Sequence, residues 1–153
     1  LALTVEQVVT QAVSLKAAFE PRPQLVVETP NLRVLADKER LERVVGHLIQ
    51  NAIEATPKSG TVDVRVAETA AGALVEITDT GEGMSEEFIR ERLYKPFDST
   101  KSAGMGIGVF ESREYIHELG GQLEVRSEPG KGTTFCIVLP PYRQEPQLAT
   151  KAA

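Results

Sequence analysis

The chain has 153 residues, 41% of them hydrophobic and 25% charged, and these proportions indicate one globular domain and exclude a disordered or collagen-like chain. A net charge of −5 argues against nucleic acid as the main partner, and no apolar run approaches the ~20 residues that span a bilayer. Because Cys136 is the only cysteine, no intrachain disulfide can form, and we expect a cytoplasmic domain without membrane contact of its own.

The chain opens on Leu1 and not on methionine. We therefore expect a piece of a longer protein, one that could be anchored in a membrane elsewhere. Within this piece we expect the folded domain over residues 1–140, followed by a disordered polar tail over residues 141–153.

The first quarter of the chain predicts one helix and a strand hairpin. Thr4 followed by Gln7 has the spacing of a capping box, and apolar residues recur at helical spacing to about Phe19. Two short runs rich in Leu and Val follow, over residues 25–28 and 32–36, with a proline-containing turn between them. This pattern is typical of a β-hairpin.

The middle of the chain predicts a second helix and a pair of strands. Asp37 is placed to cap a helix that ends near Pro57. Residues 62–66 alternate valine with polar residues, and residues 74–79 form a second run of this kind, so both favour half-buried strands. Ser85 then precedes two glutamates, a composition typical of the start of a short helix.

The last third predicts a loop, a helix and a hairpin. Residues 94–108 lack periodicity and indicate a functional loop. A helix is expected from about Ile107 to Leu119, and strands over residues 123–126 and 133–139 flank a glycine-rich turn. The whole order favours an α/β (α+β) fold, a two-layer sandwich in which helices cover one face of a mixed sheet.

A polar stripe on the second predicted helix is the first candidate site. His47, Asn51 and Glu54 stand at i, i+4 and i+7 and therefore share one side of the helix. Most such stripes are solvated faces. The amide oxygen of Asn51, however, is a suitable ligand for a hard cation such as Mg²⁺ whose other ligands are phosphate oxygens and water.

Asp79 is the second candidate. It lies in phase with Val75 and Ile77, so a strand that buries those side chains also buries a carboxylate. Such burial is costly unless a donor reaches the carboxylate. Gly81 and Gly83 follow and leave room for a ligand, a combination that suits an amino group on a flat heterocycle, although a turn led by an aspartate would show the same residues.

Gly104, Gly106 and Gly108 form the third candidate, before the next predicted helix. Amides at a helix N-terminus attract phosphate. The segment is not a Rossmann fingerprint, because no strand precedes it, and it is not a Walker A loop, because no Gly-Lys-Ser/Thr follows. By itself it is a weak indication of nucleotide binding.

Taken in order, these segments resemble those of a known family. The chain reads HLIQNAIEAT at 47–56, DTGEGM at 79–84, YKPFDSTK at 94–101, GMGIG at 104–108 and GKGTTF at 130–135. The set resembles the N, G1, F, G2 and G3 boxes of the ATP-binding catalytic domain of sensor histidine kinases, within the GHKL ATPase superfamily. The resemblance covers residues 4–140 and implies the Bergerat ATP-binding fold, with ATP and Mg²⁺ as ligands.

The resemblance also implies roles for individual residues. Asn51 matches the asparagine that binds Mg²⁺, Asp79 matches the aspartate that accepts from the adenine amino group, and Gly81 and Gly83 match the lining of the base pocket. It further implies nucleotide contacts at Glu54, Ala55, Met84, Lys95, Phe97, Ser99, Thr100, Lys101, Gly104, Met105, Gly106, Gly108 and Thr133.

Two positions depart from the family pattern. Glu54 stands where many histidine kinases have a basic residue, which weakens the case for a phosphate contact there. His47 stands four residues before Asn51, where hydrolytic members of the superfamily have a general-base glutamate, so efficient ATP hydrolysis is not expected. No residue of this chain is a firm catalytic candidate, and His47 is a candidate auxiliary residue that orients phosphate or water.

The implied function is transfer of the ATP γ-phosphoryl group to a histidine on an upstream dimerisation domain, in a two-component system with a response regulator. His47 and His117 are the only histidines, and glycines that end the helix follow His117 where the acceptor motif would continue. We therefore expect the isolated chain to bind ATP without phosphorylating itself. Two alternatives stay open, namely an ATP-hydrolysing clamp module and a non-catalytic, nucleotide-gated interaction module.

Overall fold

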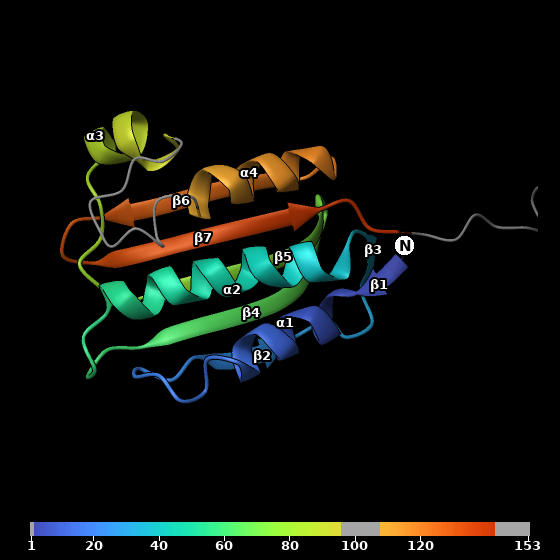
Figure 1. Ribbon diagram of the computed structural model, residues 1–153, viewed down its shortest axis with the longest axis horizontal. Coiled ribbons are helices and arrows are strands. Elements are labelled where there is room, and N and C mark those ends of the chain that lie inside the picture. Colours follow the sequence, from blue (N-terminus) through green and yellow to red (C-terminus); the bar gives the residue numbers. More distant parts are fainter. Residues whose placement is uncertain (1, 96–107, 143–153) are drawn as a thin grey trace, which may run out of the picture.

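The structure is a computed structural model that describes residues 2–95 and 108–142. Helices lie over one face of a five-stranded sheet (Figure 1), so the predicted two-layer α/β sandwich with a mixed sheet is confirmed. None of the described helices is long and apolar enough to cross a membrane. The elements in chain order are β1 (Ala2–Thr4), α1 (Val5–Ser14), β2 (Gln24–Val27), β3 (Arg33–Leu35), α2 (Lys38–Ala55), β4 (Val62–Thr69), β5 (Gly72–Asp79), α3 (Glu86–Phe88), the π-helical turn η1 (Ile89–Leu93), α4 (Gly108–Glu118), β6 (Gln122–Glu128) and β7 (Gly132–Leu139).

The large sheet has the strand order β2-β4-β5-β7-β6. β2 runs parallel to β4, whereas the other neighbours are antiparallel. The predicted β4–β5 and β6–β7 pairs are therefore both present. β5 lies at the centre, and its last residue, Asp79, faces Thr133 of β7 on one side and Val62 of β4 on the other.

The core lies between the sheet and the helices. Val62, Val64 and Val66 of β4 are at most 1% exposed, as expected for alternating residues on a covered sheet face. Leu48 and Ile49 of α2 are completely buried against them, and burial of each such side chain stabilises the fold by roughly 1.5–3 kcal/mol.

The opposite face of the sheet has a polar centre. The Glu76 carboxylate accepts a hydrogen bond from Arg65 Nε at 3.0 Å and lies 3.6 Å from Arg126 Nη2. Cys136 is buried beside them as a free thiol, and burial raises its pKa. Charged residues at the middle of this face fit a sheet that is covered on one side.

The predicted hairpin over residues 25–28 and 32–36 is wrong. β2 pairs with β4 in the large sheet, and β3 pairs with β1 in a separate two-stranded sheet. The residues between them include Asn31, which has a positive φ of 66°. The prediction failed because the partners of both strands are distant or unrecognised segments, and β1 is too short to show a periodic pattern.

The predicted capping box at Thr4 is also wrong. Thr4 does precede α1, but its side chain makes no capping hydrogen bond. Thr4 is the last residue of β1, and the next N–H, that of Val5, donates to Leu32 O at 2.8 Å. The helix ends at Ser14 and not near Phe19, because tighter turns follow, in which Lys16 N–H donates to Val13 O at 3.0 Å.

The other predicted helix ends are confirmed. Asp37 Oδ1 accepts from Arg40 N–H at 3.0 Å, and Ser85 Oγ accepts from Phe88 N–H at 3.1 Å. After α4, Gly120 has a φ of 82°. Its N–H donates to His117 O and the next N–H donates to Ile116 O, both at 2.9 Å, which is the Schellman pattern.

The segment after β7 returns to β3. Tyr142 N–H donates to Arg33 O at 2.7 Å, and the Arg33 guanidinium lies 5.3 Å from the centre of the Tyr142 ring. β3 is therefore bonded to β1 and also to the last described residue of the chain.

Candidate functional site

The first part of the candidate site forms around Asp79, whose side chain is only 4% exposed. Asp79 Oδ1 accepts from Gly81 N–H at 2.8 Å and from Thr133 N–H at 3.3 Å. Val75 and Ile77 are at most 2% exposed, which confirms the predicted inward phase. Backbone donors thus offset the cost of burying this carboxylate.

Ser127 extends this hydrogen-bond network. Its Oγ accepts from Met84 N–H at 2.8 Å, donates to Gly132 O at 2.9 Å and lies 2.7 Å from Thr133 Oγ1. Ser127 was not among the predicted site residues, although it follows Leu123 and Val125 at a spacing of two and so shares their face of β6. We call Asp79, Gly81, Met84, Ser127 and Thr133 the Asp79 cluster.

The glycines after Asp79 have a steric reason within the fold itself. Gly83 has a φ of 74°, and a Cβ there would collide with Glu128 O. A Cβ at Gly81 would collide with the carbonyl oxygen of Ala55, the last residue of α2. That same oxygen accepts from Glu82 N–H at 3.2 Å, so the end of α2 packs directly on the loop that follows Asp79.

The second part of the site lies on α2, close to that end. His47 Nε2 and Asn51 Oδ1 are both buried, and neither has a hydrogen-bond partner among the residues that the structure describes. Unsatisfied buried polar atoms are rare in folded proteins and mark places where a water, an ion or a ligand is missing. We call these two residues the α2 edge, and their i, i+4 spacing places them on one side of the helix.

The α2 edge offers few ligands of its own to a metal ion. Among the described residues, no group of three or more His, Cys, Asp or Glu side chains could hold one. The buried, unpartnered Asn51 Oδ1 fits a cation such as Mg²⁺ that takes its remaining ligands from phosphate and water.

The N-terminus of α4 packs against His47. A Cβ at Gly108 would collide with the His47 ring. Burial is the main cause that lowers the pKa of His47, the positive charge of Lys16 adds to it, and Glu111 and Glu54 act in the opposite direction. His47 therefore favours its neutral form.

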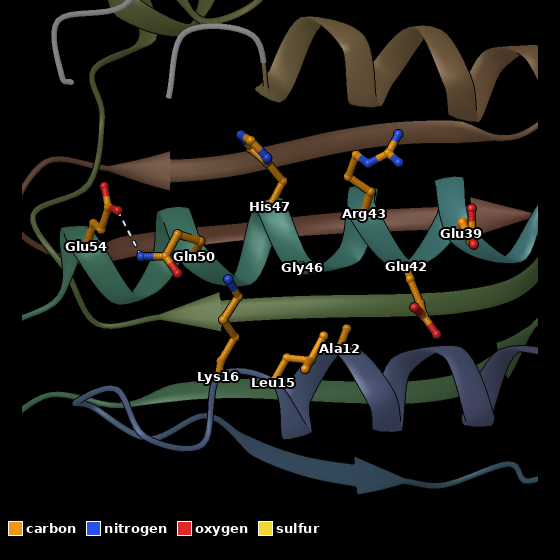
Figure 2. Close-up of a pocket in the computed structure, with 10 residues that line it drawn as sticks. All are labelled: Ala12, Leu15, Lys16, Glu39, Glu42, Arg43, Gly46, His47, Gln50 and Glu54. Atoms are coloured by element: carbon orange, nitrogen blue, oxygen red, sulfur yellow. Dashed lines mark hydrogen bonds between the residues drawn. The ribbon is translucent and has the colours of Figure 1, made fainter. Parts of the chain in front are cut away.

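The other predicted residues are in varied surroundings. Glu54 Oε2 accepts from Gln50 Nε2 at 2.9 Å (Figure 2), Met84 packs against the core, and Lys95 is exposed. Three predicted residues do lie at the site. Ala55 contacts the loop after Asp79, Gly108 contacts the His47 ring, and Thr133 belongs to the Asp79 cluster. The remaining predictions lie outside the described residues, namely Phe97, Ser99, Thr100, Lys101, Gly104, Met105 and Gly106.

Comparisons with known proteins identify the family. The sequence profile of the family described as "Histidine kinase-, DNA gyrase B-, and HSP90-like ATPase" matches residues 36–143. Sporulation kinase C of Bacillus subtilis (strain 168) is 39% identical over 113 residues, which are 74% of this chain and 26% of that protein. Sensor histidine kinase ZraS of Escherichia coli (strain K12) is 31% identical over 153 residues, which are 90% of this chain and 33% of that protein. The chain therefore spans a quarter to a third of these relatives.

Solved structures show the same fold. Mycobacterial sensor histidine kinase MprB superposes with a TM-score of 0.78 at 25% identity, over 94% of this chain and 99% of that one. The catalytic domain of histidine kinase ThkA also reaches 0.78 at 25% identity, over 92% and 94% of the two chains.

Proposed function

The chain belongs to the histidine kinase-, DNA gyrase B-, and HSP90-like ATPase family, and from this premise we propose that it binds Mg-ATP and donates the γ-phosphoryl group to a histidine. The acceptor lies on a dimerisation domain of a longer parent protein, and the phosphoryl group then passes to a response regulator. The matches cover only 26% of Sporulation kinase C and 33% of ZraS, which supports such a parent. A solved structure described as ThkA in complex with a response regulator, TrrA, supports the second partner.

The observation that carries this proposal is the unsatisfied Oδ1 of Asn51, next to the end of α2 that packs on the Asp79 loop. With the adenine amino group donating to Asp79, the phosphates run from the Asp79 cluster along the α2 edge. Asn51 Oδ1 then holds the metal. The N-terminus of α4, which lies beside His47, favours the negative charge of the phosphates.

Phosphoryl transfer needs positioning and charge neutralisation more than covalent help from the protein. When bound, Mg²⁺ supplies part of that neutralisation. His47 Nε2 is buried at the same edge and orients a phosphate oxygen or a water, while Asp79 fixes the base and excludes nucleotides that present a carbonyl at that position.

Calorimetric titration with ATP, in the presence and absence of Mg²⁺, tests the binding step. We expect Asn51→Ala to lose the Mg²⁺-dependent part of the affinity, because the ligand oxygen is removed, and Asp79→Asn to bind ATP more weakly in both conditions. Gln122→Ala, which removes an exposed amide from β6, is the control and should bind as the parent chain does. An Asn51→Ala variant with unchanged Mg²⁺ dependence would contradict the proposed metal role.

Incubation with γ-labelled ATP tests the transfer step. We expect no label on this chain alone, and acid-labile label on the parent's dimerisation domain when it is added in trans. The transfer in trans will be weak, because separation of the domains removes the effective concentration that a linker provides. Rapid hydrolysis by the chain alone would indicate the clamp module, and binding without any transfer would indicate the nucleotide-gated interaction module.

A further inference from the structure

A groove of about 630 Å³ lies between α1 and α2 (Figure 2). On the α2 side it is lined by residues that include His47, Gln50 and Glu54, and on the other side by Ala12 and by Leu15 and Lys16 in the turn after α1. His47 lies at the border of this groove and also belongs to the α2 edge, and its ring is directed toward α4 (Figure 2). The groove therefore adjoins the candidate nucleotide site.

Two cations line this groove, Arg43 on α2 and Lys16 in the turn after α1, together with the carboxylates of Glu39, Glu42 and Glu54. Lys16 is the cation that reaches toward α2 from the opposite side of the groove. Its backbone is fixed in the turn, since its N–H donates to Val13 O at 3.0 Å and its carbonyl accepts from Phe19 N–H at 3.1 Å. Figure 2 shows its side chain directed from the turn toward α2. Its positive charge is also among the causes that lower the pKa of His47, so the ammonium group lies within electrostatic reach of the imidazole ring.

Among the described residues, no carboxylate forms an ion pair with the Lys16 ammonium. Its Nζ lies 5.7 Å from the centre of the Phe19 ring. The carboxylate of Glu54 in the same groove accepts instead from Gln50. The side chain is half-buried, and a half-buried ammonium gains more from an anion than a fully exposed one does.

The direction of the bound nucleotide decides which phosphate this cation meets. With the base at Asp79, a triphosphate on the α2 edge passes Asn51 first and then His47, one helical turn farther from the Asp79 loop. The group opposite His47 is therefore the terminal phosphate. Lys16 faces this turn of α2 from the groove.

We infer that Lys16 binds the terminal phosphate of the nucleotide and so positions the group that is transferred and distinguishes ATP from ADP. This inference rests on the proposed function and adds a phosphate contact from the turn after α1. It deepens that function by assigning a positioning residue outside all the sequence segments that resemble the family boxes.

The test compares ATP with ADP in calorimetric titrations of the whole chain with Mg²⁺. Lys16→Met should weaken ATP binding roughly tenfold, as expected for loss of a charge-assisted contact, and should change ADP binding less than about twofold. Lys16→Arg keeps the charge and should retain most of the ATP affinity. Lys38→Met removes an exposed lysine at the start of α2 and controls for the change in net charge.

Two results would overturn the inference. One is a Lys16→Met variant that binds ATP as the parent chain does, and the other is an equal loss of ATP and ADP affinity. In both cases the parent chain still binds ATP, so the proposed function stands. A parent chain that binds neither nucleotide refutes the proposed function and this inference together. Thermal unfolding of each variant verifies that it is folded.

Discussion

The Asp79 cluster lies beside the C-terminal end of α2, and the α2 edge lies along the C-terminal half of that helix, but their polar atoms are satisfied to different degrees. In the Asp79 cluster, donors and acceptors from β5, β6, β7 and the following loop bond to one another. On the α2 edge, no residue in the described ranges bonds to the buried His47 Nε2 or Asn51 Oδ1. In the first region the fold supplies hydrogen-bond partners, to which the proposed adenine contact adds, whereas in the second region the described residues supply none to these two atoms.

This difference assigns opposite energetic roles to the two regions. Satisfied buried groups contribute to folding, and an unsatisfied buried donor or acceptor costs about 1–3 kcal/mol. A ligand that bonds to the α2 edge would remove that cost, and this gain would add to its binding free energy. Substitutions at the Asp79 cluster should therefore weaken folding as well as binding, and substitutions at the α2 edge should weaken mainly binding.

The largest expected effect is that of Asp79→Ala on stability. The substitution leaves the N–H groups of Gly81 and Thr133 without their acceptor, and we expect the free energy of unfolding to fall by about 3 kcal/mol. Urea denaturation measures this change. Asp63→Ala removes an exposed carboxylate from the neighbouring strand and should stay within about 0.5 kcal/mol of the parent chain. Equal effects of the two variants would contradict a role of the Asp79 cluster in folding.

An intermediate effect is expected from two glycines on helices. A Cβ at Gly108 collides with the His47 ring, whereas a Cβ at Gly46 has nothing within 4 Å. Gly108→Ala should therefore destabilise the fold by about 1–2 kcal/mol, and Gly46→Ala should stabilise it by roughly 0.5–1 kcal/mol, because alanine is the better helix former.

A double variant sharpens this second prediction. If the His47 ring is the obstacle, His47→Ala should remove most of the cost of Gly108→Ala in a double-mutant cycle. Additive effects would show that the ring and the N-terminus of α4 are not coupled.

The smallest expected effect is the pH dependence due to His47. Its pKa is lowered in the folded chain from the ordinary value of 6.5, mainly by burial. The unfolded chain therefore binds more protons, so the stabilisation is present above pH 6.5 and is lost as the pH falls below it. Urea denaturation at pH 7.5 and 5.5 should show a smaller loss for His47→Gln than for the parent chain. An identical loss of stability in the parent chain and the variant would indicate that the His47 side chain is solvated and not buried.

Local signals in the sequence predicted what depends on neighbouring residues. The caps at Asp37 and Ser85, the inward phase of Asp79 and the stop at Gly120 are set by residues a few positions away. No local signal predicted the pairing between strands that are distant in the sequence. β2 bonds to β4 across the whole of α2, and no pattern within residues 25–36 distinguishes that arrangement from a hairpin.

The residues of the candidate site show the same difference between local signals and long-range contacts. Asn51 and Asp79 could be proposed from helix and strand phase, while Ser127 and Lys16 depend on contacts that only the folded chain makes. Ser127 meets Met84 across 43 residues, and Lys16 reaches α2 from a turn that was predicted to be helix. The steric need for Gly108 also comes from a distant residue, His47.

The attachment of both ends of the described chain to β3 has a mechanical consequence. Pulling on residues 2 and 142 loads the β1–β3 pair and the bond from Tyr142 to Arg33 before it loads the five-stranded sheet. β5 extends from Gly72, which pairs in the sheet near Leu139, to Asp79 at the far end, a length of about 23 Å at ~3.3 Å per residue. Tension between the two ends can therefore be borne at one edge of the domain, while the end of the sheet that carries Asp79 keeps its shape.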